Sequence, residues 1–373
     1  MSNPLDPAKL TAAVENVHRA GMPGLFAEVR AGEEIWRGAA GTADLDTGRP
    51  VTADLKHRVG SVTKTFTAAA VLLQVESGEI GLDAPIGRYL PKLVPGASGD
   101  AITVRMLLNH TSGLAEYLPY AYPSFAAFPA LADTGPQSMD DHRHTRFDRV
   151  ELIRTGVGAP PFCAPGGSPG LYSNTNYLLL AELLAQVTGT TAEQYITSAV
   201  IARAGLRDTE FPTGAHIDGP HSRLYEAWFG MLEPPHEYSV FDMSYAGPSA
   251  SLISTVADLS RFYRLLLAGE IVAPSSLAEM RRTVRVVSQE GKVIDYGLGL
   301  YPLEDSGPGG TFWGHGGTVW GGGTLAMIRA DGERQLAVAV NLQRWNTFDS
   351  SGTLQPHPLD AALADLYRVA MYG

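Results

Sequence analysis

The feature that most constrains this chain is a short run, residues 58–64 (RVGSVTK), that leads into an apolar stretch at residues 65–75. The apolar stretch is rich in alanine and leucine, in the pattern of a buried helix. Ser61 then lies in the first turn of that helix. Lys64 falls on the same face, because Cβ atoms three positions apart lie about 5–6 Å from each other. The run therefore predicts a helix that begins with a serine hydroxyl within reach of a lysine amine.

A serine and a lysine at this spacing have the chemistry of a nucleophile and its base. A free serine hydroxyl is a poor nucleophile at neutral pH and needs a positioned base. A lysine can be that base only if burial or neighbouring cations lower its pKa toward the working pH. N–H groups at a helix start can also bind an oxyanion. The plainer interpretation is that Ser61 caps the helix and Lys64 is solvated, and the spacing alone does not separate the two.

Composition limits the class of protein and its partners. With 373 residues, 45% of them hydrophobic, the chain can bury a large core and hold one large or two interleaved domains. The formal net charge of −11 disfavours nucleic acid and anionic membranes as partners. The single cysteine, Cys163, excludes an internal disulfide, and no metal-ligand spacing such as His-Glu-x-x-His occurs. We therefore expect no metal and no cofactor.

The N-terminus bears on localisation. Residues 1–7 have neither a basic nor an apolar segment, so no secretory signal is visible, and no apolar run reaches transmembrane length. We expect a cytoplasmic protein, or a secreted one if a leader has been removed. The sequence leaves the oligomeric state open.

Strand patterns lie at both ends of the chain, and helix patterns lie between them. A long segment rich in Tyr, Phe and Pro, residues 115–148, has no clear period and is expected to be a loop over a cleft. The other expected elements are a helix at 8–20, a hairpin at 24–38, helices at 103–108, 178–187, 191–204 and through Leu267, strands at 296–301, 310–314, 324–328 and 335–341, and a helix at 359–371.

The economical architecture for this order is an α+β fold. Both chain ends build one antiparallel sheet, the terminal helices pack on it, and a mostly helical region is inserted between. We expect residues 1–56 and 286–373 to form the sheet region and residues 57–285 the inserted region. The active site would lie at their junction, where pockets are common.

Three short motifs follow one another along the chain: residues 61–64 (SVTK), 172–174 (YSN) and 315–317 (HGG). Taken singly, each has a structural explanation. Together with the surrounding phrases HRVGSVTK, YSNTN and YGLGL, they resemble the serine β-lactamase and penicillin-binding protein superfamily. The branch they resemble is that of class C β-lactamases and soluble D-alanyl-D-alanine carboxypeptidases. The resemblance covers nearly the whole chain and implies a β-lactamase/DD-peptidase-like fold.

The resemblance also implies a two-step covalent mechanism. The protein would be a serine hydrolase or acyltransferase acting on an ester, thioester or amide. Ser61 would form the acyl-enzyme, and Lys64 and Tyr172 would share the proton transfers, with Tyr172 a phenolate whose pKa is held low by Lys64. Asn174 would donate to the substrate's amide, and His315 would complete the proton network. The N–H groups of Ser61 and Thr318 would form the oxyanion hole.

Two departures from the family pattern concern the substrate pocket. The carboxypeptidases usually have His-Thr-Gly as the third motif, and an arginine after the YGLGL phrase binds the substrate's terminal carboxylate. Here Gly316 and Tyr301 stand near those positions, and the carboxylates of Glu304 and Asp305 would repel a free C-terminus. We therefore expect an apolar acyl or amine pocket. Its expected residues are Tyr117, Tyr120, Tyr245, Tyr301, Gly316, Gly317 and Trp320.

Several alternatives stay open for the activity. One is a D-alanyl-D-alanine carboxypeptidase or D-amino-acid peptidase, and another is a penicillin-binding-protein-like thioesterase that cyclises peptides. A catalytically inactive binding protein would have lost at least one motif residue, and none is lost. In every enzymatic case the partner is a small-molecule or peptide acyl substrate. The sequence does not identify the acyl group, nor whether water or an amine resolves the acyl-enzyme.

Overall fold

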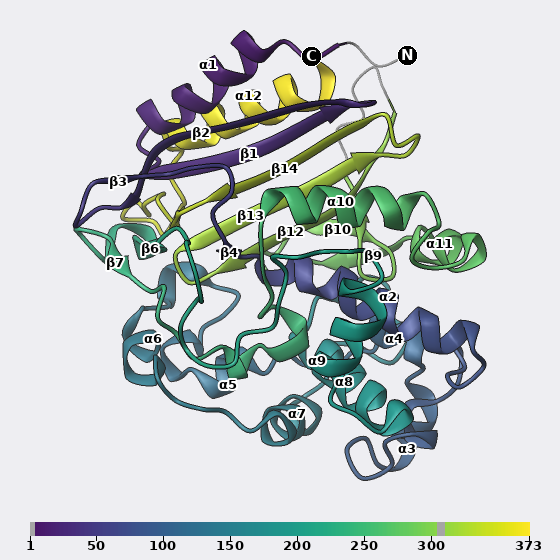
Figure 1. The fold of residues 1–373 in the computed structure, drawn as a ribbon. Helices are drawn as coiled ribbons and strands as arrows, with labels where there is room; N and C mark the ends of the chain where they lie inside the picture. Colours follow the sequence, from purple (N-terminus) through teal and green to yellow (C-terminus); the bar gives the residue numbers. More distant parts are fainter. Residues whose placement is uncertain (1–3, 304–309) are drawn as a thin grey trace.

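One antiparallel sheet forms the centre of the fold (Figure 1). The computed structural model describes residues 4–303 and 310–373. The sheet has seven strands in the order β11-β12-β13-β14-β1-β2-β3, and each neighbouring pair is antiparallel. Its strands are β1 (Gly24–Ala31), β2 (Glu34–Asp44), β3 (Arg49–Pro50), β11 (Tyr301–Pro302), β12 (Phe312–Val319), β13 (Gly322–Arg329) and β14 (Arg334–Val340). The predicted α+β fold with an antiparallel sheet built from both chain ends is confirmed.

The two ends of the chain meet where β1 pairs with β14, from Leu25 opposite Val340 to Ala31 opposite Arg334. Helices α1 (Pro7–Arg19) and α12 (Pro358–Tyr372) cover one face of the sheet, and α10 (Val256–Leu267) lies on the other (Figure 1). Both faces are therefore covered, and every residue of β14 is buried. This explains why its sequence reads as a continuous apolar run instead of an alternating one.

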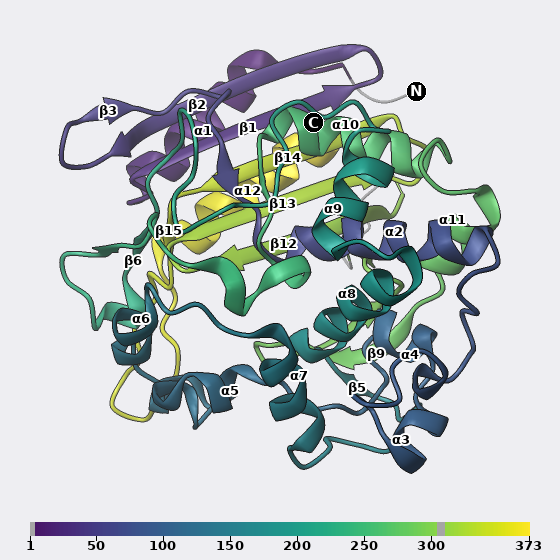
Figure 2. The same cartoon turned by 60° about the horizontal axis from the view of Figure 1, so that its bottom comes forward.

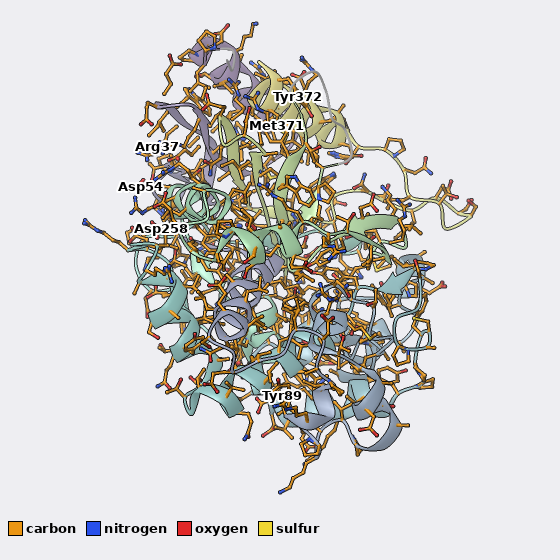
Figure 3. The ribbon with its side chains drawn as sticks, turned by 90° about the vertical axis from the view of Figure 1, so that its right-hand side faces the viewer. Arg37, Asp54, Tyr89, Asp258, Met371 and Tyr372 are labelled. Carbon is orange, nitrogen blue, oxygen red and sulfur yellow. The ribbon has the colours of Figure 1, made fainter. Side chains whose placement is uncertain are left out.

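The helical region lies beyond the β12 edge of the sheet (Figure 2). Its helices are α2 (Thr63–Glu76), α3 (Gly96–Ala101), α4 (Val104–Leu108), α5 (Leu118–Ala121), α6 (Gln137–His142), α7 (Arg149–Gly158), α8 (Asn174–Thr188), α9 (Ala192–Ile196) and α11 (Pro274–Met280). Short strands join it: β4 (His57–Arg58), β5 (Gly170–Leu171), β6 (Tyr225–Glu226), β7 (His236–Glu237), β8 (Ile253–Ser254), β9 (Val284–Val287), β10 (Val293–Tyr296) and β15 (Leu342–Gln343). In side view, Met371 and Tyr372 of α12 lie toward one end of the molecule and Tyr89 of the helical region toward the other (Figure 3).

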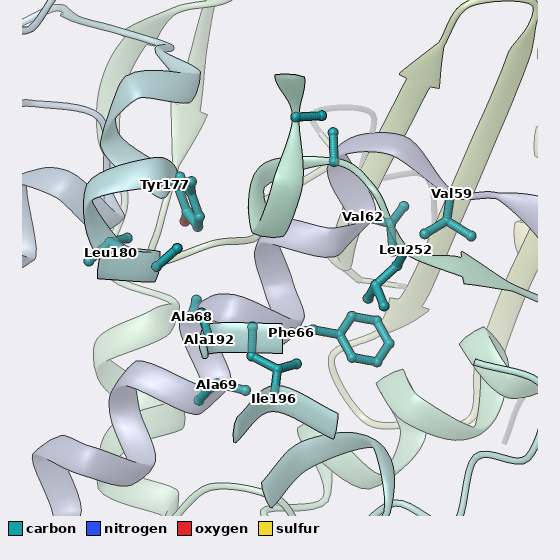
Figure 4. Close-up of a cluster of buried hydrophobic side chains, with 14 of the residues drawn as sticks. Val59, Val62, Phe66, Ala68, Ala69, Tyr177, Leu180, Ala192, Ile196 and Leu252 are labelled. Carbon is teal, nitrogen blue, oxygen red and sulfur yellow. The ribbon is translucent and has the colours of Figure 1, made fainter. Parts of the chain in front are cut away.

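Helix α2 runs through the middle of the core (Figure 4). Its residues from Thr63 to Leu72 are all buried, as the apolar pattern predicts. The ring of Phe66 stacks on that of Phe262 in α10, with centroids 3.7 Å apart. Because α10 packs on the sheet, this contact joins the helical region to the sheet region. No described helix combines the length and the apolar character needed to cross a membrane.

Two predicted elements differ from the structure. Residues 115–148 are not one irregular loop, because they contain α5, α6 and the 3-10 turns η3 (Pro123–Phe125) and η4 (Leu131–Asp133). Each piece is too short to show a period in the sequence. The strand predicted at 296–301 is interrupted, since β10 ends at Tyr296 and β11 begins at Tyr301. Between them Gly299 has a φ of +74°, which a regular strand does not allow. The division into residues 1–56 with 286–373 and residues 57–285 stays a prediction.

Candidate active site

Ser61 lies where the main chain just before α2 meets strand β12. It belongs to a 3-10 turn, η1 (Gly60–Val62), that continues into α2. Two glycines allow this contact. A Cβ on Gly60, whose φ is +55°, would lie 2.6 Å from the Thr318 nitrogen, and a Cβ on Gly317 would lie 1.9 Å from the Val59 oxygen. Turn and strand are therefore in backbone contact, which no side chain at either glycine position would permit.

The same contact brings the two N–H groups of the predicted oxyanion hole to one place. A Cβ on Gly317 would lie 2.9 Å from the Ser61 nitrogen, so Ser61 and the residue after Gly317, Thr318, are close neighbours. Gly316 donates its N–H away from β13, to Tyr301. Residues two apart on an antiparallel strand point their N–H groups to the same side, so the Thr318 N–H points to that edge too. This is the geometry that an oxyanion hole requires, and its role stays a prediction.

Lys64 is completely buried, so the interpretation of it as a solvated residue is wrong. Its Nζ atom donates to Ser61 Oγ at 3.1 Å, to Asn174 Oδ1 at 2.7 Å and to the Ser249 carbonyl at 3.0 Å. Burial lowers the pKa of Lys64 to about 7, although the charge of Glu116 opposes this. The amine is thus held at the serine hydroxyl with a pKa suited to a general base.

Glu116 is a site residue that the sequence did not reveal. Its carboxylate is buried and accepts hydrogen bonds from the backbone N–H of Asn174 at 2.6 Å, from Asn174 Nδ2 at 3.1 Å and from the Leu118 N–H at 3.0 Å. Burial raises its pKa, while these donors and Lys64 oppose the change. With Nδ2 bound to Glu116, the Oδ1 of Asn174 points to Lys64. Asn174 therefore holds the lysine, and its predicted donation to the substrate is not favoured by this geometry.

Tyr172 lies next to both Ser61 and Lys64. Its ring faces Lys64, whose Nζ is 4.8 Å from the centroid, and it packs against His110 with centroids 4.3 Å apart. Burial raises the pKa of Tyr172 well above its ordinary value, and a hydrogen bond with Ser61 opposes this only in part. The prediction of a phenolate with a low pKa is therefore wrong for this structure. A neutral Tyr172 is instead a proton donor.

His315 lines the cleft but has both ring nitrogens engaged. Nδ1 forms a short hydrogen bond with the Gly316 carbonyl, and Nε2 lies 2.8 Å from the hydroxyl of Tyr296. Since a carbonyl only accepts, Nδ1 carries the proton and Nε2 accepts from Tyr296. Burial lowers the pKa of His315 to about 3, so the ring is neutral at working pH. His315 reaches the other site groups through its neighbours, and its place in a proton network stays a prediction.

A cavity of about 370 Å³ opens at Ser61. Tyr172, His315 and Thr318 line it, and so do three residues of the predicted pocket, Tyr301, Gly316 and Gly317. The turn between β9 and β10 contributes Ser288, Gln289, Glu290 and Lys292. Glu304 and Asp305, which we expected near this end, lie outside the described residues.

The remaining four residues of the predicted pocket are not among those lining this cavity. Tyr120 is exposed on α5, whereas Tyr117, Tyr245 and Trp320 are buried. Tyr245 stacks on Trp320 with centroids 5.9 Å apart, inside a cluster that includes Tyr122 and Phe125. Large aromatic side chains bury much apolar area and pack in interiors. The sequence placed these rings near the cleft but could not show that they pack against one another.

The arrangement supplies the parts of nucleophilic catalysis at a carbonyl. It has a serine hydroxyl, a buried amine that can accept a proton, a neutral phenol that can donate one, and the N–H groups of Ser61 and Thr318 close together. Within residues 4–303 and 310–373, no group of three or more His, Cys, Asp or Glu side chains could hold a metal ion.

Comparison with known proteins gives a consistent result. A family model described as Beta-lactamase matches residues 10–357. Penicillin-binding protein 4* of Bacillus subtilis is 24% identical over 332 residues, which are 86% of this chain and 68% of that protein. Esterase EstB of Burkholderia gladioli is 35% identical over 220 residues, or 56% of this chain and 53% of the esterase. The match thus spans only about half of the esterase.

Solved structures match over more of the chain. A D-stereospecific amidohydrolase from Streptomyces sp. is 34% identical, with a TM-score of 0.79, over 93% of this chain and 97% of the other. D-amino acid amidase from Ochrobactrum anthropi SV3 has the same TM-score of 0.79 at 22% identity, over 97% of each chain, which shows the shared fold.

Proposed function

We propose that this chain, which belongs to the beta-lactamase family of serine hydrolases, cleaves amides or small esters of D-amino acids through an acyl-enzyme on Ser61. The observation that carries the proposal is the buried Lys64 amine, 3.1 Å from Ser61 Oγ and with its pKa lowered to about 7. A lysine in this state is a base that can activate a serine.

The first step forms the acyl-enzyme. Neutral Lys64 takes the proton of Ser61 as Oγ attacks the substrate carbonyl, and the N–H groups of Ser61 and Thr318 stabilise the oxyanion. When the C–N or C–O bond breaks, the leaving amine or alcohol takes a proton from Tyr172, which regains one from the protonated Lys64. The bond formed is the Oγ ester, and the bond lost is that to the leaving group.

The second step returns the enzyme to its starting state. Water enters where the leaving group was and gives one proton to the same Lys64 and Tyr172 pair. Its oxygen attacks the ester, and the proton then passes to Ser61 Oγ as the ester bond breaks. The product is a free carboxylic acid, and no other reactant is consumed.

The substrate class is supported by the solved structure that is 34% identical over 93% of this chain, a D-stereospecific amidohydrolase. The D-alanyl-D-alanine carboxypeptidase and the peptide-cyclising thioesterase remain alternatives. Intact motifs at Ser61, Tyr172 and His315 favour an enzyme over a binding protein.

The test is the hydrolysis of D-phenylalanine amide and L-phenylalanine amide by wild type and by Ser61→Ala. We expect wild type to prefer the D-enantiomer and Ser61→Ala to lose at least about a thousandfold in kcat/KM. Ser77→Ala is the matched control, because it removes a serine hydroxyl at the far end of α2 and should keep full activity. Full activity of Ser61→Ala, or a preference for the L-enantiomer, would overturn the proposal.

A further inference from the structure

We infer that Tyr301 closes the leaving-group end of the cleft and restricts the enzyme to short, uncharged leaving groups such as ammonia or a small alcohol. A peptide whose leaving group carries a free carboxylate would then be a poor substrate. The inference rests on the proposed function and names the specificity of the same site.

The first observation concerns the free edge of β12. Strand β11 pairs with β12 only at Tyr301 opposite Gly314 and Pro302 opposite Trp313. Beyond Gly314, the described part of the chain places no further strand along this edge up to Val319. An open strand edge next to a nucleophile is where an extended substrate can pair through its main chain.

The second observation is that the main-chain N–H and carbonyl groups of Gly316, on this edge, already have hydrogen-bond partners. Its N–H donates to the Tyr301 hydroxyl at 2.8 Å, and its carbonyl accepts the short hydrogen bond from His315 Nδ1. A Cβ on Gly316 would lie 2.8 Å from the Tyr301 hydroxyl, so the phenol fills the space a side chain there would need. Gly316 and Thr318 are the two residues whose main-chain groups face the open edge. Only those of Thr318 are left to bind a substrate.

The direction of pairing decides which end of the substrate is blocked. If the substrate carbonyl accepts from the Thr318 N–H and the substrate runs antiparallel to β12, its N-terminal side points toward Trp320. Its C-terminal side, which holds the leaving group, points toward Gly316. The second residue after the scissile bond would fall opposite Gly316, where the Tyr301 hydroxyl holds the N–H. A longer leaving group therefore finds no main-chain partner there.

The charges at this end do not favour a carboxylate either. Glu290 and Lys292 both line the cavity from the turn between β9 and β10. Glu290 accepts from the Ser288 hydroxyl at 2.9 Å, and its charge contributes to the raised pKa values of Tyr172 and Tyr301. The negative charge of Glu290 offsets the positive charge of Lys292. This turn thus supplies no net positive charge for a carboxylate.

The experiment compares D-phenylalanine amide with the tripeptide D-phenylalanyl-D-alanyl-D-alanine, on wild type and on Tyr301→Phe, with the release of D-phenylalanine measured for both. The last residue of the tripeptide is the second one after the scissile bond and so falls opposite Gly316. We expect wild type to have at least a tenfold higher kcat/KM on the amide. Tyr301→Phe keeps the ring but frees the Gly316 N–H, and one hydrogen bond of about 1.4 kcal/mol corresponds to roughly tenfold. In the variant, kcat/KM for the tripeptide should therefore rise about tenfold relative to kcat/KM for the amide.

Tyr89→Phe is the matched control, because Tyr89 is not among the residues that line this cavity. Its hydroxyl also accepts a backbone N–H, that of Gly81 at 2.8 Å, so the substitution makes the same chemical change elsewhere. The substrate ratio of this control should equal that of wild type. Equal hydrolysis of both substrates by wild type, or an unchanged ratio in a folded Tyr301→Phe, would overturn the inference while leaving the proposed function intact. If wild type hydrolyses neither D-substrate, the proposed function fails, and the inference fails with it.

Discussion

At the scale of single residues, the site depends on one buried amine. Lys64 has no exposed surface, and the Ser61 hydroxyl, the Asn174 amide oxygen and the Ser249 carbonyl surround its Nζ atom. In the proposed mechanism the Ser61 hydroxyl is the group that the amine activates, and the other two neighbours hold the amine in place. The low pKa of Lys64 is thus a consequence of burial, and the orientation of its amine toward Ser61 is a consequence of hydrogen bonding.

The pH dependence of activity follows from this amine. A lysine whose pKa is lowered to about 7 is protonated below that pH and is a neutral base above it. We therefore expect kcat/KM for an amide to rise with pH through about 7 and then level off. His315, whose pKa is lowered to about 3, stays neutral in this pH range and therefore adds no further pH dependence to kcat/KM. A profile that is flat from about pH 5 to 9 would contradict Lys64 as the base.

Replacing the lysine tests the same point at fixed pH. Lys64→Arg keeps a cation but cannot lose its proton at working pH. We expect this variant to lose at least about a thousandfold in kcat/KM at every pH measured, because the serine then has no base. If kcat/KM of the variant still rose with pH as in wild type, another group would have to be the base.

Glu116→Gln tests a positioning role. The glutamine keeps the shape but loses one acceptor and the negative charge that faces Lys64. We expect the acid limb of kcat/KM to move to lower pH, because Glu116 raises the pKa of Lys64. We also expect kcat to fall about tenfold or more as Asn174 loses its partner. Gln137→Glu on α6 is an exposed control with the reverse charge change. An acid limb at the wild-type position would contradict the role of Glu116.

Residue patterns predicted part of this site and missed the rest for a physical reason. Ser61 and Lys64 are three positions apart on one helix, so local geometry is enough to bring them together. Glu116 reaches them from a segment without a period, and its role depends on a tertiary contact with Asn174. The pKa of Tyr172 was predicted with the wrong sign, since the charge of Lys64 was considered and the cost of burial was not.

At the scale of elements, the contact between η1 and β12 sets the positions of the Ser61 and Thr318 N–H groups, which we propose as the oxyanion hole. Gly317→Ala would put a Cβ 1.9 Å from the Val59 oxygen and 2.9 Å from the Ser61 nitrogen. We expect it to lower the free energy of unfolding by roughly 2–3 kcal/mol and to reduce kcat more than it raises KM. Thermal unfolding and steady-state kinetics measure the two effects.

Gly158→Ala is the matched control, at the end of α7, where a Cβ would meet nothing within 4 Å. Its stability should stay within about 0.5 kcal/mol of wild type. If Gly317→Ala were as stable and as active as this control, β12 and η1 could not lie as close as the structure has them.

Long periodic elements were predicted well, and short ones were not. The helices α1, α10 and α12 and the strand pair β13 and β14 have enough residues to show their periods. Helices α5 and α6 are too short for this, because one or two turns do not establish a helical period. Gly299 divides one predicted strand into two, since it combines a positive φ with close packing against Ala68.

At the scale of the whole molecule, the sheet region and the helical region share one core. The same cluster of buried side chains contains Phe26 of β1, Phe66 of α2 and Leu179 of α8. The order of strands and helices in the sequence predicted the architecture, because the two chain ends must pair to complete the sheet. It did not predict how much core the two regions share, which depends on contacts such as that between Phe66 and Phe262.

A shared core predicts one cooperative unfolding transition. Phe66 is fully buried, and Phe66→Ala should lower the free energy of unfolding by about 3–5 kcal/mol. Urea unfolding should be followed by tryptophan fluorescence and by far-ultraviolet circular dichroism. For each protein, wild type or variant, the curves from the two probes should coincide. Phe162→Ala, at a half-exposed position, should change stability by no more than about 0.5 kcal/mol. Two separate transitions would show that the regions unfold independently.

The central claim is that Ser61 carries the acyl group. The most direct test is the intact mass of the protein after brief mixing with the nitrophenyl ester of D-phenylalanine and an acid quench, with Ser61→Ala alongside. We expect wild type to gain the mass of one D-phenylalanyl group, mapped to the peptide that contains Ser61, and Ser61→Ala to gain none. The same adduct on Ser61→Ala, or an adduct mapped to another residue, would contradict the claim.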